Sequence, residues 1–166
     1  MKFSIASLQD TAYLAEVLAS HLRPRDMIVL AGDMGTGKTT FTQFFGRALG
    51  ITEPITSPTF NLLHNYGSGR MALHHADLYR LERTGELADL GLNELQDIGG
   101  VIVVEWGDIV GNELGDALII RFAHPADVDA IYSRSIEIDL RGQQWLSRWQ
   151  KISDELATKF SDLVRG

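Results

Sequence analysis

The chain has 166 residues, 45% of them hydrophobic and 22% charged, and this ordinary globular composition argues against a disordered protein. It contains no cysteine, which excludes disulfides, cysteine-based zinc sites, iron–sulfur clusters and thiol nucleophiles. The formal net charge of −7 argues against non-specific nucleic-acid binding, because that binding depends on the neutralisation of phosphates.

The length and the apolar runs bound the organisation of the chain. At about 150 residues per domain, residues 1–166 predict one domain. The longest apolar runs, Met27–Ala31 and Val101–Val104, fall far short of the ~20 residues of a membrane-spanning helix, and the N-terminal segment lacks the apolar core of a signal peptide. We therefore expect a cytoplasmic protein with no membrane-embedded part.

Up to Gly50, strand patterns alternate with helical ones. Ser7-x-x-Asp10 resembles a capping box at a helix start, and the continuous apolar run Met27–Ala31 indicates a strand buried on both faces. The predicted elements, in chain order, are a strand at Phe3–Ile5, a helix that starts after Ser7 and ends before Pro24, a strand at Met27–Ala31, and a helix at Lys38–Leu49 capped by Gly50.

The rest of the chain begins with strands and ends with a helix. The predicted elements are a hairpin of Phe60–Tyr66 with Met71–Tyr79, helical turns at Glu86–Leu90 and Asn93–Gln96, strands at Val101–Glu105, Ala117–Phe122 and Ile131–Leu140, and a final helix with Trp145, Trp149, Ile152, Leu156, Phe160 and Leu163 on one face. That face either packs on the sheet, which we favour, or forms a partner surface. The order predicts an α/β fold, with a mixed, mostly parallel sheet, flanking helices and a β-hairpin.

The segment Gly32–Thr39 matches the phosphate-binding pattern G-x-x-x-x-G-K-[ST], and it stands between a predicted buried strand and a helix. Glycines let the backbone N–H groups turn toward phosphate oxygens, Lys38 supplies a charge to the β- and γ-phosphates, and the Thr39 hydroxyl can ligate Mg²⁺. No guanine-reading Asn-Lys-x-Asp motif occurs, so ATP is the expected nucleotide. The candidate nucleotide-binding residues of the loop are Asp33, Met34, Gly35, Thr36, Gly37, Lys38, Thr39 and Thr40.

Two acidic residues are candidates for the metal and the catalytic water. Glu105 ends the apolar run Val101–Glu105, as a carboxylate near the metal does in phosphate-loop nucleotidases; the alternative is an ordinary surface glutamate at a strand end. Period-two spacing places His75, Asp77 and Tyr79 on one face of a strand. This polar stripe is either part of a site or the solvated face of a hairpin, and the pattern alone does not decide.

A third candidate lies in Ser57-Pro58-Thr59-Phe60, between the loop helix and the hairpin. A threonine such as Thr59 senses the γ-phosphate and the metal in several phosphate-loop enzymes. The alternative, which the residues slightly favour, is a turn that Ser57 starts and Pro58 fixes.

The phosphate loop, Ser57-Pro58-Thr59-Phe60, His75-Ala76-Asp77-Leu78-Tyr79-Arg80-Leu81 and Val104-Glu105-Trp106 stand in this order, and together they resemble the TsaE (YjeE) family. The resemblance implies a compact phosphate-loop ATPase of bacterial tRNA threonylcarbamoyladenosine synthesis that binds ATP and Mg²⁺ and hydrolyses ATP slowly alone. It implies TsaD and TsaB as partners, with the threonylcarbamoyl transfer left to TsaD and tRNA met only indirectly.

The same resemblance assigns roles to particular residues. Thr39 and Asp77 match the metal site, Glu105 matches the carboxylate of the metal or the catalytic water, and Thr59 matches the switch-like threonine. Trp106 matches a tryptophan of the nucleotide site, the alternative being a core aromatic beside a strand end. Lys38, Asp77 and Glu105 are thus the expected catalytic residues.

Two other function classes remain open. A small-molecule kinase shares the phosphate loop, but it needs an acceptor pocket and usually an arginine-rich lid, and the arginines here are scattered. A nucleotide-regulated binding module with negligible turnover differs only in whether hydrolysis is needed.

Overall fold

The computed structural model describes residues 1–58, 62–79, 85–107, 113–124 and 133–164. These residues form a seven-stranded sheet in the order β1-β7-β6-β2-β5-β4-β3. The strands are β1 (Lys2–Ile5), β2 (Met27–Ala31), β3 (Leu63–Tyr66), β4 (Leu73–Asp77), β5 (Val101–Glu105), β6 (Ala117–Ala123) and β7 (Arg134–Arg141). Strands β6, β2, β5 and β4 run parallel through the centre, and the outer pairs are antiparallel. The predicted α/β fold with its mixed sheet and hairpin is confirmed.

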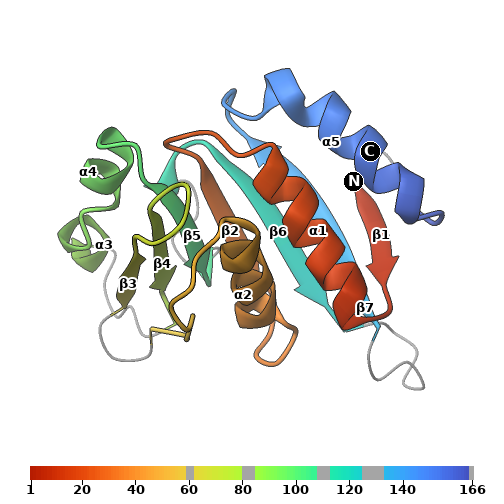
Figure 1. Ribbon diagram of the computed structural model, residues 1–166, viewed down its shortest axis with the longest axis horizontal. Coiled ribbons are helices and arrows are strands. Elements are labelled where there is room, and N and C mark those ends of the chain that lie inside the picture. The colour runs from red at the N-terminus through yellow and green to blue at the C-terminus, as the bar shows by residue number, and fades with distance from the viewer. Residues whose placement is uncertain (59–61, 80–84, 108–112, 125–132, 165–166) are drawn as a thin grey trace.

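The longer helices gather on one face of this sheet (Figure 1). They are α1 (Leu8–Ser20), α2 (Lys38–Ala48) and α5 (Leu146–Lys159). The short helices α3 (Gly85–Asp89) and α4 (Leu92–Asp97) lie beside β4 and β5, where Leu87 and Leu92 pack on the opposite face. Strands β2, β5 and β4 are thus covered on both sides.

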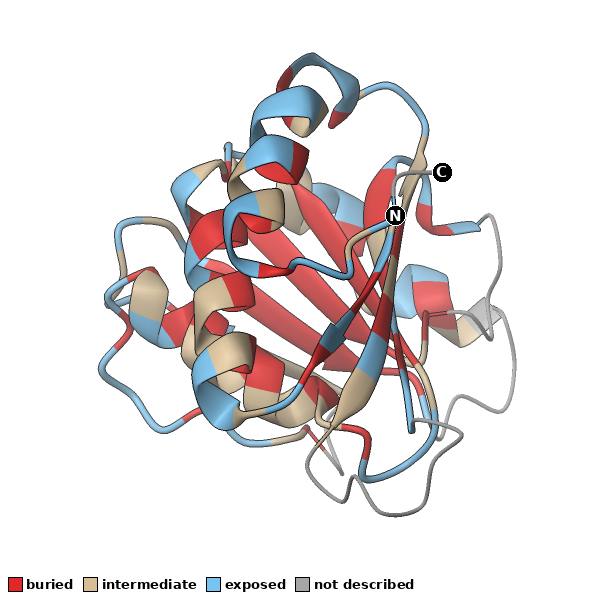
Figure 2. Cartoon of the chain, turned by 90° about the vertical axis from the view of Figure 1, so that its right-hand side faces the viewer, coloured by how far each residue is buried: buried red, intermediate tan, exposed pale blue. Residues whose placement is uncertain are grey.

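Every residue of β2, β4 and β5 is buried, as the red strands at the centre of Figure 2 show. Successive side chains of a strand enter opposite faces, so an apolar cluster forms on each side. Ile28 and Val103 join Phe41 of α2 in one cluster, whereas Val29 and Val104 belong to the other. Continuous apolar runs in the sequence therefore correspond to strands with no exposed face.

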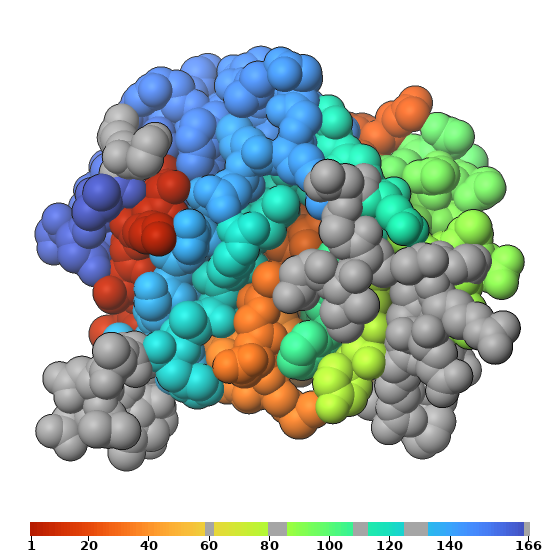
Figure 3. Space-filling view, turned by 180° about the vertical axis from the view of Figure 1, so that it is seen from behind, coloured from red at the N-terminus to blue at the C-terminus, as the bar shows by residue number. Residues whose placement is uncertain are grey.

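Strands β6 and β7 have one partly exposed face, and their teal and light-blue atoms reach the surface in Figure 3. On β7, Ile136 and Ile138 are buried, whereas Ser135, Glu137 and Asp139, which alternate with them, reach solvent. There Arg121 pairs with Asp139, and Lys2 of β1 lies 3.4 Å from Glu137. The imperfect alternation of the sequence in β7 reflects this one-sided burial.

Helix α5 packs on the sheet, as favoured above. Trp145, Ile152, Leu156 and Phe160 are buried in the same apolar cluster as residues of α1, and the Phe160 ring stacks on Phe3 of β1 with 4.6 Å between the ring centres. The pattern of large residues along this helix is therefore explained by the core.

The predicted hairpin strand is longer than β4, which ends at Asp77 rather than at Tyr79. The Asp77 carboxylate accepts a hydrogen bond from the Tyr79 backbone N–H (3.0 Å), which turns the chain out of the ladder. The predicted start of β7 at Ile131 lies outside the described residues, and the strand is described from Arg134.

The start of α1 contains the expected cap. Ser7 Oγ accepts from the Asp10 N–H (3.1 Å), while the Asp10 carboxylate accepts from the Ala6 N–H (2.9 Å) and lies 3.1 Å from Lys159 Nζ. Partial burial alone would raise the pKa of Asp10, but the bonds to Ala6, Lys159 and Ser7 outweigh it and hold this pKa below 3.8.

A carboxyl group whose pKa is lowered by folding stabilises the fold above its unfolded pKa and loses that contribution as the pH falls through the folded value. Asp10→Asn is therefore expected to lower the free energy of unfolding by about 0.5–1 kcal/mol at pH 7. The difference should be smaller at about pH 3 than at pH 7, because the unfolded carboxyl group then binds a proton. Urea titrations at both pH values test this, with the exposed Asp89→Asn as control. A deficit that is equal at both pH values would contradict it.

Candidate functional site

The loop after β2 is shaped by glycines. Gly32 has φ +128°, and a Cβ there would collide with the Phe122 carbonyl oxygen, so only glycine fits. Gly37 has φ +106° and serves as the N-cap of α2 without a side-chain cap bond. The first N–H groups of a helix have no partner within the helix, and those of α2 lie at the positive end of its dipole, facing the loop. This is the geometry of an anion-binding loop.

Lys38, the first residue of α2, turns its side chain back into the loop. Its Nζ donates to the carbonyl oxygens of Gly32 (2.7 Å) and Asp33 (2.9 Å), and it lies 4.0 Å from the centre of the Trp106 ring. The residue is only 5% exposed. A positive charge is thereby fixed at the mouth of the loop.

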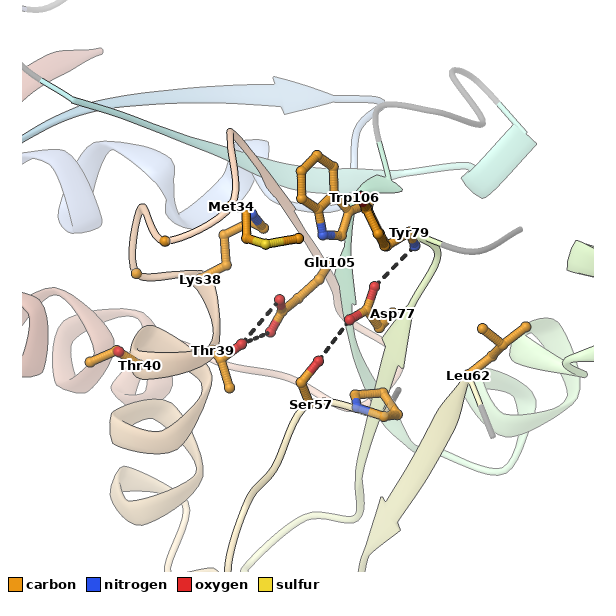
Figure 4. A pocket seen from close by; sticks show the side chains of 13 residues that line it. Met34, Lys38, Thr39, Thr40, Ser57, Leu62, Asp77, Tyr79, Glu105 and Trp106 are labelled. Carbon is orange, nitrogen blue, oxygen red and sulfur yellow. Dashed lines mark hydrogen bonds between the residues drawn. The ribbon is translucent and has the colours of Figure 1, made fainter. Parts of the chain in front are cut away.

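A cavity of about 390 Å³ opens in front of this loop (Figure 4). It is lined by Met34, Gly35, Gly37, Lys38, Thr39, Thr40, Ser57, Pro58, Leu62, Asp77, Tyr79, Glu105 and Trp106. Most of the candidate residues thus meet at one place. Asp33 and Thr36 do not line it; the buried Thr36 donates its hydroxyl to the Asp33 carbonyl and so braces the loop (2.8 Å). Thr59 lies outside the described residues.

The two candidate carboxylates stand side by side because of strand register. Asp77 and Glu105 are partners at the ends of the parallel strands β4 and β5. Thr39 Oγ1 donates to Glu105 at 3.0 Å from Oε1 and 3.2 Å from Oε2, so the first turn of α2 touches the end of β5. Asp77 accepts from Ser57 Oγ at 2.7 Å. Figure 4 shows Glu105 between Lys38, Thr39 and Asp77.

The alternatives that placed these residues at the surface are wrong. Glu105 is 3% exposed, Asp77 9% and His75 0%. Strand β4 lies between β3 and β5, which protects its backbone, and its stripe faces the same side as α2. A solvated hairpin face would need a strand with one open side, and β4 has none.

The donors in the cavity fit a divalent cation that shares its coordination with a phosphate. Among the described residues no three His, Asp or Glu side chains cluster as a complete metal site. One hydroxyl and two carboxylates converge instead, from Thr39, Asp77 and Glu105. Mg²⁺ is commonly held by one or two carboxylates together with substrate phosphates rather than by an all-protein cage.

Trp106 lines the cavity, and it also packs on the core beside the end of β5. Its partly buried ring packs on the apolar cluster of the far face, and it also stacks near Tyr79, with 5.0 Å between the centres. Its backbone has φ +61°, which is rare for a bulky residue and costs about 1–3 kcal/mol. The Trp106 N–H donates to the Leu30 carbonyl (2.9 Å), which helps to hold this conformation. Such strain is typical of functional sites.

The sequence does not predict the place of several cavity residues. Ser57 belongs to the segment interpreted as a turn, yet it binds Asp77 from 20 positions away. Tyr79 was placed beside Asp77 by its period-two spacing but given no role, and no sequence signal pointed to Leu62 as part of the lining. His75 shares the stripe and contacts Glu105.

The fold and the loop together define a phosphate-loop protein of the α/β class. The family model "Threonylcarbamoyl adenosine biosynthesis protein TsaE" matches residues 5–136, so the chain belongs to the TsaE family. This confirms the resemblance. Within the described residues, no helix has the length and apolar character needed to cross a membrane.

Individual relatives agree with this assignment. The chain is 40% identical over 114 residues to the tRNA threonylcarbamoyladenosine biosynthesis protein TsaE of Bacillus subtilis, covering 69% of this chain and 71% of that protein. The TsaE protein of Treponema pallidum is 44% identical over 108 residues, with 65% and 79% covered. The crystal structure of YdiB from Bacillus subtilis superposes with a TM-score of 0.74 at 30% identity, covering 95% and 94%.

Proposed function

We propose that the chain is the ATP-binding and ATP-hydrolysing component of the tRNA threonylcarbamoyladenosine machinery, acting as one phosphate-loop domain. The observation that carries this proposal is the meeting of the loop lysine, Lys38, with the contact between Thr39 and Glu105 at one cavity. A phosphate cradle beside a buried carboxylate is the arrangement that phosphoryl transfer to water requires.

Within this proposal, Lys38 and the loop N–H groups hold the β- and γ-phosphates. Thr39, Asp77 and Glu105 would hold Mg²⁺, which when bound neutralises phosphate charge. Glu105 orients the attacking water and accepts its proton, since its carboxylate is fixed by Thr39. Ser57 fixes Asp77 in turn. Thr59 keeps its proposed role as sensor of the γ-phosphate.

The nucleoside part of ATP is proposed to lie on the other side of the loop. A second cavity of about 150 Å³ shares Gly35, Gly37 and Thr40 with the first. Its wall includes Arg134 of β7, whose Nε donates to the Thr36 carbonyl at 3.2 Å. Trp106 closes the phosphate side.

We further propose that turnover is slow alone and is completed by partners. Among the described residues that line the main cavity there is no arginine to stabilise the transferred phosphoryl group. A partner-supplied arginine is worth about 10³–10⁵ in rate. The partners proposed are TsaD and TsaB in the cytoplasm, with TsaD transferring the threonylcarbamoyl group and ATP hydrolysis driving or resetting the complex. The net charge of −7 favours contact with tRNA through these proteins.

Measuring ATP turnover with and without TsaD–TsaB tests the proposal. We expect release of free phosphate that rises by at least about 10-fold when the pair is added. Equal rates would reject the partner-completed site. Transfer of the γ-phosphate to a metabolite instead of water would favour a small-molecule kinase. Co-purification with TsaD and TsaB, with ATP present and absent, tests the association itself.

A further inference from the structure

We propose that His75 is a positioning residue that orients the Glu105 carboxylate toward the metal and the phosphates. This inference rests on the proposed function and deepens it. The inference starts from the contact between His75 and Glu105, which the proposed mechanism of ATP hydrolysis does not use. His75 Nε2 lies 2.9 Å from Glu105 Oε1, and both side chains are almost completely buried.

The contact completes a brace around the carboxylate. Thr39 reaches Glu105 from the first turn of α2, and His75 reaches it from β4, so two separate elements fix its rotamer. Oε1 accepts from both His75 and Thr39. Among the described contacts, Oε2 accepts only from Thr39, at 3.2 Å. Oε2 is therefore the oxygen with lone-pair capacity left for a cation or a water.

The position of His75 in the sheet argues against a plain core residue. Along the face toward α2, β4 carries Leu73, His75 and Asp77, and their partners on β5 are Val101, Val103 and Glu105. His75 is therefore paired with an apolar residue of β5, Val103. The next pair on this face consists of the two carboxylates, Asp77 and Glu105, which line the cavity.

The second ring nitrogen of His75 shows what burying an imidazole costs, and the buried His74 bears the same cost at Nε2. His75 Nδ1 has no hydrogen-bond partner among the described residues. A buried polar atom left without a partner costs about 1–3 kcal/mol, which a leucine would avoid. The imidazole thus costs stability at Nδ1, which has no partner among the described residues, and contacts Glu105 through Nε2. A side chain that holds a metal-binding group in this way typically changes metal affinity or activity by about 10–100-fold when it is removed.

Three replacements of His75 separate positioning from packing. His75→Leu keeps the bulk and removes the donor. In His75→Gln the amide nitrogen can stand where Nε2 was, whereas in the shorter His75→Asn it stands near Nδ1 and does not reach Glu105. The matched control is His74→Leu on the same strand, a buried histidine whose Nδ1 contacts Asn65 (2.6 Å) and whose side chain enters the opposite face.

The readouts are Mn²⁺ affinity of the ADP-bound protein by electron paramagnetic resonance, kcat and KM for ATP, and the urea midpoint. His75→Leu and His75→Asn are expected to weaken Mn²⁺ binding and lower kcat by about 10–100-fold, with KM changed less than about threefold. His75→Gln should recover part of both. His74→Leu should change the urea midpoint only.

Equal Mn²⁺ affinity in His75→Gln and His75→Asn would overturn the inference, and so would losses in kcat that follow the urea midpoint in every variant, His74→Leu included. If His75→Leu does not fold, the pair His75→Gln and His75→Asn decides alone. A wild-type chain that binds neither ADP nor Mn²⁺ would reject the proposed function and this inference together. Wild-type binding with unchanged His75→Asn would reject only the inference.

Discussion

Lys38→Ala is expected to abolish measurable nucleotide binding, with the affinity for ATP and ADP falling by about 100-fold or more. The Lys38 Nζ group is the positive charge that would bind the phosphates. It donates to the carbonyl oxygens of Gly32 and Asp33 and lies over the Trp106 ring. A charged hydrogen bond of this kind contributes about 1.5–3 kcal/mol, and phosphate oxygens make more than one. Isothermal titration calorimetry with ADP and with ATP measures the loss.

The control for this variant is Lys151→Ala, an exposed lysine on α5 that does not line the main cavity. It should bind nucleotide like the wild-type chain, which excludes an effect of net charge. Circular dichroism shows whether the loop variant is folded. If folded Lys38→Ala retained wild-type affinity, the assignment of the phosphate loop would be refuted.

Glu105→Gln is expected to lower the rate of ATP hydrolysis by about 10²–10⁴-fold, the usual contribution of a general base. The amide keeps an oxygen that can accept from Thr39 and His75, so the variant should still fold and bind ATP within about threefold of wild type. Single-turnover assays and titration of ATP measure the two quantities. The exposed Glu94→Gln on α4 serves as control and should hydrolyse ATP normally.

This replacement also separates an ATPase from a nucleotide-regulated binding module. A module that only senses bound ATP should support threonylcarbamoyladenosine formation with TsaD and TsaB when Glu105 is replaced. An ATPase whose hydrolysis resets the complex should complete at most a single cycle. Multiple cycles by Glu105→Gln would therefore contradict the proposed mechanism.

The parts of the site that the sequence predicts are those encoded by neighbouring residues. The phosphate loop Gly32–Thr39 can be predicted, because its pattern, the preceding apolar strand and the following helix all lie within one stretch of chain. Glu105 could be proposed in the same way from the apolar run that it ends. The buried strands β2 and β5 can be predicted in the same local way, because a continuous apolar run is typical of a strand covered on both faces, whereas β4 is equally buried but contains His74, His75 and Asp77.

The parts that could not be predicted depend on which strands are neighbours. Period two placed His75 and Asp77 on one face, but only the order β2-β5-β4 buries that face and brings it to Glu105. The contact of Ser57 with Asp77 and that of His75 with Glu105 span 20 and 30 residues of chain, so no spacing rule contains them. The positive φ of Trp106 is likewise invisible in the sequence, because a tryptophan normally avoids that conformation.

The register of β4 on β5 also bears on where a conformational cycle can occur. Asp77 and Glu105 end the fully buried strands β4 and β5, so their amide hydrogens should exchange with solvent more slowly than those of the exposed loops. The side of the cavity that carries the two carboxylates is therefore expected to be rigid. Changes between nucleotide states are therefore expected in the loops around the cavity, where Met34 and Tyr79 are exposed and Ser57 donates to Asp77.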